Sequence, residues 1–304
     1  MLSESINTYL SIRRALGFKL NSIQTYLASY ERFATNAGDT YVRTETAIKW
    51  AEQSASENSR SRRMDVLIRF ARFVHADDNR HEIPPEKIFC FRRTRRPPYI
   101  FTDEEVLRLV QEAHRLGPSG TLRPYTYSTL FGLLAATGMR ISEALTLRFS
   151  DITPNGLIIR ETKFRKSRLV YLHNSVAAAL DQYLTMRRRM VGDDEHIFVS
   201  NRGGHALGYT IVAETFQLLL DTAGIKGVEG RSKPHLHDLR HRFAIKALMT
   251  CPDSRDRVAR HMLALTTYMG HAHIGSTYWY LDNTPQLMSD IAHTCQAFIQ
   301  GDTP

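Results

Sequence analysis

The sequence predicts a mainly helical protein of two domains that also contains a small antiparallel sheet. Apolar residues recur at helical spacing along most of the 304 residues, as they do over residues 23–33. Two short runs with strand character, residues 156–160 and 168–172, lie together near the middle of the chain. The segment FRRTRRPPYI, residues 91–100, separates two helical regions, because consecutive prolines prevent a helix.

The first 91 residues predict a small module of four short helices. Its first apolar stripe starts near Ile6 and ends at Gly17, and the second covers residues 23–33. A third helix opens at Thr44, and a fourth spans residues 59–74. The arginines of this last helix lie off its apolar face and can contact DNA, with a plain solvated surface as the alternative: Arg60, Arg62, Arg63, Arg69 and Arg72.

A basic linker over residues 92–98 is expected to join the two domains. Its four arginines, expected to contact DNA phosphates, are Arg92, Arg93, Arg95 and Arg96. The alternative for this run is a plain solubilising hinge.

Residues 99–304 predict a larger second domain. Thr102 and Glu105 form a capping box at its start, and a buried helix over residues 127–136 is closed by Gly138. The two strand-like runs form a hairpin whose turn lies near residues 163–166. Further helices are expected at residues 174–188, 210–223, 234–248 and 254–268, and after Pro285.

Charge indicates a polyanionic partner. The net charge is +9 with a pI near 9.6, and residues 1–98 carry 17 basic and 11 acidic side chains. This surplus favours nucleic acid over a membrane as the partner. Three scattered cysteines support neither a disulfide framework nor a thiolate zinc site, and no signal peptide or spanning stretch is recognisable. We therefore expect a cytoplasmic, nucleoid-associated protein.

Two arginines are suited to hold a phosphodiester during cleavage. The attacked phosphate gains negative charge in the transition state, and guanidinium groups can bind its nonbridging oxygens in pairs. Arg140, in TGMRISEAL, and Arg240, in LHDLRHRFA, are the candidates. Glu143 lies three residues after Arg140 and can orient it from the same helical face.

The remaining chemistry needs proton transfer and a nucleophile. His237 lies one helical turn before Arg240 and can assist proton transfer, although His235 and His241 compete for this role. A lysine on the hairpin tip can protonate the leaving 5′ oxygen, with Lys163 preferred to Lys166. Alternatively, both lysines only contact phosphates.

A tyrosine late in the chain is the candidate nucleophile. Its phenol has an ordinary pKa of about 10, so cationic neighbours and a base are needed to activate it. Residue type alone leaves Tyr280 and Tyr278, both in STYWYL, equally suitable. Attack would store the bond energy in a phosphotyrosyl link, so that rejoining needs neither metal nor ATP.

These motifs together resemble the tyrosine recombinase, or phage integrase, family. TGMRISEAL resembles its first arginine box, ETKFRKSRLVYL its β-hairpin, LHDLRH its HxxR box and MGHAHIGSTYWYL its last box. The resemblance implies six active-site residues: Arg140, Lys163, His237, Arg240, His271 and Tyr280. Tyr280 is preferred to Tyr278 because it lies nine residues after His271, the spacing typical of the family.

The family resemblance also implies an architecture and partners. It implies a helical core-binding domain over residues 1–91, a linker over 92–98 and an integrase-type catalytic domain over 99–304. The expected partner is double-stranded DNA with inverted half-sites, bound by a dimer that becomes a tetramer in synapsis. Accessory proteins or companion recombinases remain open. STYWYL followed by TPQLM resembles recombinases of transposons and integrative elements, which carry out integration, excision or transposition.

Three other functions are compatible with parts of this pattern. A type IB topoisomerase uses the same phosphotyrosyl chemistry, but the order of the motifs and the short chain favour a recombinase. An architectural DNA-binding protein would not need the complete set of six residues. A histidine metal site would use the HxH pairs at His235 and His271, yet no carboxylate or cysteine completes a ligand set at zinc-site spacing. We expect neither a metal nor another cofactor.

Overall fold

The chain divides into two compact units, residues 1–96 and 97–304. The structure is a computed structural model, and it describes residues 2–18, 20–89, 97–160, 167–191, 194–201, 203–227, 233–250 and 255–270. Each unit has its own hydrophobic core.

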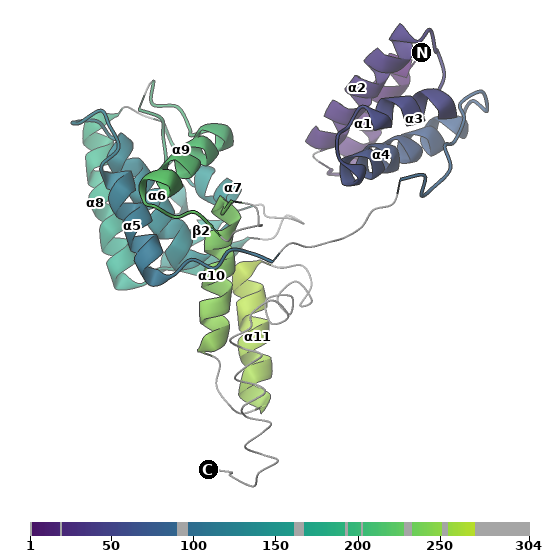
Figure 1. Cartoon of the computed structure of the whole chain (residues 1–304). Coiled ribbons are helices and arrows are strands. Elements are labelled where there is room, and N and C mark those ends of the chain that lie inside the picture. The colour runs from purple at the N-terminus through teal and green to yellow at the C-terminus, as the bar shows by residue number, and fades with distance from the viewer. Residues whose placement is uncertain are drawn as a thin grey trace. The chain divides into compact units, whose positions relative to one another are not determined.

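The N-terminal unit is a bundle of four helices (Figure 1). Its core contains the fully buried side chains of Trp50, Tyr30 and Phe70, with the Trp50 and Tyr30 rings in edge contact at a centroid distance of 5.3 Å. Apolar residues at spacings of three and four bring one face of each helix to this core. The helices are α1 (Leu2–Ala15), α2 (Asn21–Asn36), α3 (Thr44–Glu52) and α4 (Glu57–His75).

The larger unit is built on a second helical core. Leu109, Leu130, Phe131 and Phe216 are completely buried in it, and the rings of Phe131 and Phe216 meet at a centroid distance of 5.4 Å. The predicted capping box of Thr102 and Glu105 is confirmed at the start of the first helix. The helices around this core are α5 (Asp103–His114), α6 (Arg123–Thr137), α8 (Asn174–Met190) and α9 (Tyr209–Thr222).

A three-stranded antiparallel sheet lies against this core. Strand β1 (Ile152–Thr153) follows the short 3-10 helix η1 (Phe149–Asp151) and pairs with β2 (Gly156–Ile159), which pairs in turn with β3 (Arg168–Tyr171). In the central register Leu157 faces Val170, and both are completely buried. The predicted hairpin therefore forms, and its tip, residues 161–166, lies outside the described residues.

Three helices surround the region that holds the predicted site. The short helix α7 (Ile141–Leu145) follows α6 directly, while α10 (Leu236–Met249) and α11 (Arg255–Met269) lie side by side (Figure 1). A small separate core of Ile245, Leu248, Met262 and Leu265 joins α10 to α11. Helix α10 also packs on α6, and α11 contacts β3. The C-terminal ends of α6 and α11 are thereby brought together.

The mainly helical fold with a small antiparallel sheet is confirmed. Helix α6 begins four residues before the predicted start, because Pro124 suits the first helical turn and the helix continues beyond the apolar run. Strand β1 was not predicted, since two residues are too short to show alternation. The linker arginines and the helix expected after Pro285 lie outside the described residues. In the described part of the chain, no helix is long and apolar enough to cross a membrane.

Two glycines of the α6 region should respond oppositely to alanine. Gly138 ends α6 with φ +61°, and a Cβ there would overlap the Phe243 ring of α10. Gly132 lies within α6, and a Cβ there would meet nothing within 4 Å. Gly138→Ala should therefore lower the unfolding free energy by more than ~1 kcal/mol, whereas Gly132→Ala should raise it by roughly 0.5–1 kcal/mol. Urea unfolding of the full chain, followed by circular dichroism, measures both, and equal stabilities would contradict the packing of α6 on α10.

Candidate active site

Arg140 is fixed at the start of α7 by Glu143. Its backbone is extended (φ −73°, ψ 144°) at the N-cap, and its backbone N–H donates to Glu143 Oε2 at 2.9 Å. Its guanidinium Nη1 donates to Glu143 Oε1 at 2.7 Å. Both the main chain and the side chain of Arg140 are thus held by one carboxylate, while 30 % of the Arg140 side chain stays exposed.

Arg168 of β3 holds the same carboxylate from the other side. Its Nη1 donates to Glu143 Oε1 at 3.0 Å and its Nη2 to Oε2 at 2.7 Å. Only 10 % of the Arg168 side chain and 9 % of the Glu143 side chain are exposed. Burial alone would raise the pKa of Glu143, but the hydrogen bonds and charges of Arg168 and Arg140 lower it to about 2. Glu143 is therefore ionised at neutral pH.

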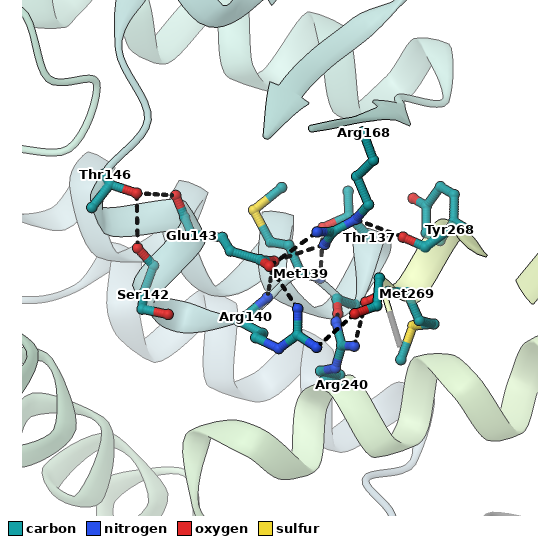
Figure 2. A network of polar contacts seen from close by, with 12 residues as sticks. Thr137, Met139, Arg140, Ser142, Glu143, Thr146, Arg168, Arg240, Tyr268 and Met269 are labelled. Carbon is teal, nitrogen blue, oxygen red and sulfur yellow. Dashed lines mark hydrogen bonds and ion pairs between the residues drawn. The ribbon is translucent and has the colours of Figure 1, made fainter. Parts of the chain in front are cut away.

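The last carbonyls of α11 and its C-cap accept from three arginines of three different elements (Figure 2). A helix leaves its final carbonyl oxygens without intrahelical donors and carries partial negative charge at this end, so guanidinium groups stabilise it. The pairs are Arg168 Nε to Tyr268 O at 2.7 Å, Arg240 Nη2 to Met269 O at 2.6 Å and Arg140 Nη2 to Gly270 O at 3.0 Å. The end of α11 is thus the point where the two predicted phosphate-binding arginines meet.

Arg240 lies in α10 and is almost completely buried, with 2 % exposure. Its Nη1 donates to the carbonyl of Gly138 at 2.5 Å, so one guanidinium links the end of α6 to the end of α11. The network contains three guanidinium groups, those of Arg140, Arg168 and Arg240, and one carboxylate, that of Glu143 (Figure 2). The described part of the site therefore keeps a positive surplus, which suits a phosphate ligand.

Three histidines lie on the first turns of α10 beside Arg240. The rings of His237 and His241 meet edge to face at a centroid distance of 4.7 Å. Desolvation, followed by the charges of Arg240 and His235, lowers the pKa of His237 to about 4. Desolvation, followed by the charge of His237, lowers the pKa of His241 to about 3. In contrast, a hydrogen bond to the buried carboxylate of Asp238 raises the pKa of His235.

At neutral pH, His237 is consequently an uncharged imidazole next to a cationic cluster. A neutral imidazole has one nitrogen that accepts a hydrogen bond, so it can take a proton from a hydroxyl group. His235, protonated more readily and paired with Asp238, cannot serve as this acceptor when it is charged. Charge state therefore separates His237 from His235, whereas His241 is also uncharged at this pH.

The structure brings together four of the residues named from sequence: Arg140, Glu143, His237 and Arg240. The other predicted catalytic residues, Lys163, His271 and Tyr280, lie outside the described residues, as does Lys166. Along the chain, His271 directly follows Gly270, and Lys163 lies five residues before Arg168. Both residues are therefore close in sequence to a residue of the network, His271 to Gly270 and Lys163 to Arg168.

Sequence reasoning assigned no role to Arg168. A usable signal existed in the strand pattern: Arg168 and Val170 are two residues apart, so their side chains point to the same face of the sheet, and Val170 is completely buried. A charged residue on a buried face needs a counter-charge, and Glu143 supplies it.

The five arginines of α4 have different partners, and the exposed Arg72 forms an ion pair with Glu86. Arg60 donates to the carbonyl of Ser54 at 2.7 Å, and Arg63 donates to that of Trp50 at 2.9 Å, so both are partly engaged within the unit. Arg62 and Arg69 are exposed. Over the described residues of both units, no group of three histidine, cysteine, aspartate or glutamate side chains is arranged to hold a metal ion.

The sequence profile of the phage integrase family matches residues 100–286. The integrase/recombinase y4rB of Sinorhizobium fredii is 35% identical over 94% of this chain and 94% of its own length. The tyrosine recombinase XerD of Rhizobium meliloti is 30% identical over 79% of this chain and 75% of its own. The chain belongs to the phage integrase family. It is a tyrosine-type site-specific recombinase, as the sequence predicted.

Solved structures of the same fold agree with this assignment. The XerH recombinase in complex with palindromic difH substrate has a TM-score of 0.66 at 18% identity and covers 90% of this chain and 78% of its own. The Tn1549 transposon integrase in complex with transposon right end DNA has a TM-score of 0.65 at 16% identity. The match covers 95% of this chain and 99% of the integrase chain. At these identities the likeness shows the fold of the recombinase.

Histidine titration by NMR tests the electrostatics of the site. The ring of His237 keeps an exposed side, where water screens the desolvation, so the prediction concerns the direction of its shift. We expect its midpoint well below 6.5, toward 4, because burial and the charge of Arg240 disfavour the imidazolium form. His235, two residues away, is the internal control and should titrate above 6.5. His237→Gln and His235→Gln assign the two signals, and a His237 midpoint at or above that of His235 would contradict the geometry.

Proposed function

We propose that this recombinase cleaves DNA with Tyr280 as the nucleophile and Arg140 and Arg240 as the ligands of the scissile phosphate. Members of the family break and rejoin DNA through a 3′-phosphotyrosyl intermediate. The observation that carries the proposal is the convergence of Arg140 and Arg240 at the end of α11, with an uncharged His237 in the field of both arginines.

The proposed cleavage is an in-line exchange of two bonds at phosphorus. The phenol oxygen of Tyr280 forms a bond to phosphorus as the bond to the 5′ oxygen breaks. The tyrosine proton passes to His237, and Lys163 protonates the departing 5′ oxygen. Arg140 and Arg240 stabilise the charge on the nonbridging oxygens, and His271 assists at the same phosphate. Rejoining reverses these steps, so the phosphotyrosyl bond conserves the energy.

The N-terminal unit is proposed to grip DNA without taking part in the chemistry. Arg62 and Arg69 are exposed on α4, whereas Arg60 and Arg63 are partly engaged by carbonyl groups of their own unit. The linker arginines and Lys166 are proposed to add phosphate contacts. Such contacts fix the register of a protein on DNA and give no sequence information.

We propose that two copies bind inverted half-sites and that two such dimers form a tetramer for strand exchange. Proteins of the same fold have been crystallised in these states: a lambda integrase dimer bound to a COC′ core site and a lambda integrase tetramer bound to a Holliday junction. Closed cyclic assemblies use the same surface of every copy, which suits a symmetric target. Residues 282–304 are proposed to pack on the same or a neighbouring copy. Accessory proteins or companion recombinases would act on this assembly.

The enzyme is further proposed to act in the movement of a transposon or an integrative element. The support is the segment STYWYL followed by TPQLM, which resembles recombinases of such elements. Integration, excision and transposition all use the same pair of cleavage and rejoining steps.

Covalent attachment tests the nucleophile. A nicked suicide substrate cut from the DNA that flanks this gene should give an SDS-resistant adduct with the wild type and with Tyr278→Phe, in buffer without metal. Tyr280→Phe should bind the same DNA and give no adduct, because the attacking oxygen is missing. Undiminished adduct with Tyr280→Phe would overturn the assignment of the nucleophile.

The salt dependence of binding tests the α4 arginines. Replacing both Arg62 and Arg69 with glutamine should lower the slope of log K against log salt by up to ~2, because each phosphate contact releases about one counterion. The control is Arg43→Gln, which removes one half-exposed arginine of the same unit that is paired with Glu82 at 3.0 Å. Equal slopes for the double variant and the wild type would place the two arginines away from DNA.

A further inference from the structure

Arg168 differs from Arg140 and Arg240 in that both of its terminal nitrogens donate to a carboxylate. Its Nε donates to Tyr268 O at 2.7 Å, and both terminal nitrogens donate to Glu143 at 3.0 and 2.7 Å. Each of its three guanidinium nitrogens thus donates to the protein, and its charge is compensated by the ionised carboxylate of Glu143. Its contacts are directed to the protein, whereas Arg140 keeps 30 % of its side chain exposed.

Glu143 transmits the position of Arg168 to Arg140. Each oxygen of its carboxylate accepts one hydrogen bond from Arg168 and one from Arg140, the latter from both the guanidinium and the backbone N–H. A carboxylate held in this way by two planar guanidinium groups has little freedom to rotate. Without Arg168, Glu143 would keep Arg140 as its partner but would lose the contact that fixes its own plane.

Gly270 shows how closely Arg168 is fitted to the end of α11. A Cβ on Gly270 would lie 2.8 Å from Arg168 Nη1, and the φ of +65° already disfavours other residues. The glycine that precedes His271 therefore leaves space for Arg168 while its carbonyl accepts from Arg140 at 3.0 Å. Arg168 thus joins the sheet, α7 and the end of α11 at one point.

We propose that Arg168 is a positioning residue for strand cleavage, which acts through Glu143 and the end of α11 to aim Arg140 at the scissile phosphate without touching DNA. The inference rests on the proposed function of Arg140. A shift of about 1 Å in a group that stabilises the transition state can cost on the order of 10²-fold in rate. Losing Arg168 should therefore slow cleavage and leave DNA affinity nearly unchanged.

The first measurement is single-turnover adduct formation on the nicked suicide substrate, together with DNA affinity. Arg168→Gln should lower the cleavage rate by roughly 10- to 100-fold with a change in Kd of less than about threefold. Arg168→Lys keeps the charge but cannot bond both carboxylate oxygens and Tyr268 O together, so it should also be slow. The matched control is Arg148→Gln, which removes an exposed arginine paired with Glu195 at 3.0 Å. This control should cleave at the wild-type rate.

Two further measurements separate positioning from a general structural role. If Arg168 acts through Arg140, adding Arg168→Gln to Arg140→Ala should lower the cleavage rate by less than about threefold. A methylphosphonate at the scissile position lacks one charged oxygen, so it needs less from Arg140. The deficit of Arg168→Gln relative to wild type should shrink on this substrate, and so should the deficit of Arg140→Ala.

Each opposite outcome overturns the inference. The inference is overturned if Arg168→Gln and Arg168→Lys fold and cleave at the wild-type rate. It is also overturned if the rate losses of Arg140→Ala and Arg168→Gln multiply in the double variant, or if the rate loss of Arg168→Gln is the same on the methylphosphonate substrate. Failure of both variants to fold, judged by circular dichroism, would assign Arg168 to stability instead. If the wild type binds the DNA but forms no adduct, the proposed function itself is overturned. If the wild type forms the adduct and the Arg168 variants are equally active, only the role of Arg168 is overturned.

Discussion

The geometry of the site depends on one buried carboxylate shared by two arginines. Glu143 binds Arg140 at the start of α7 and Arg168 on β3, and both its oxygens are used twice. Because the folded-state pKa of Glu143, about 2, lies below its ordinary value of 4.5, its charge stabilises the fold above pH 4.5, and this contribution is lost as the pH falls toward 2. Removing either arginine would leave a buried charge that is only partly compensated.

The C-terminal end of α11 brings a third arginine, Arg240, next to this ion pair. Three carbonyl groups in succession accept from arginines of β3, α10 and α7, so one helix terminus sets the positions of three cations that repel one another (Figure 2). Desolvation and, after it, the charge of Arg240 favour the neutral form of the nearby imidazole, so the pKa of His237 is lowered. The arrangement proposed to bind the scissile phosphate would thus also keep His237 in the form that accepts a proton.

The arginines of α4 show that residues of one type on one helix can have different surroundings. Arg60 and Arg63 bond carbonyl groups within the N-terminal bundle, while Arg62 and Arg69 on the same helix remain exposed. Burial decides this division, because a buried guanidinium must find acceptors inside the protein. The sequence shows five arginines on one helix, and only the packing of that helix separates them.

The sequence by itself determined the helical fold, the hairpin and the residues of the arginine and histidine boxes, because apolar periodicity and local motifs are properties of neighbouring residues. It also placed Glu143 beside Arg140, since three residues make one helical turn. Only the tertiary structure decided that Arg168 shares this carboxylate and that α11 ends against both arginines. These contacts join positions 25 and 130 residues apart, and no local pattern records which distant partner satisfies a buried charge.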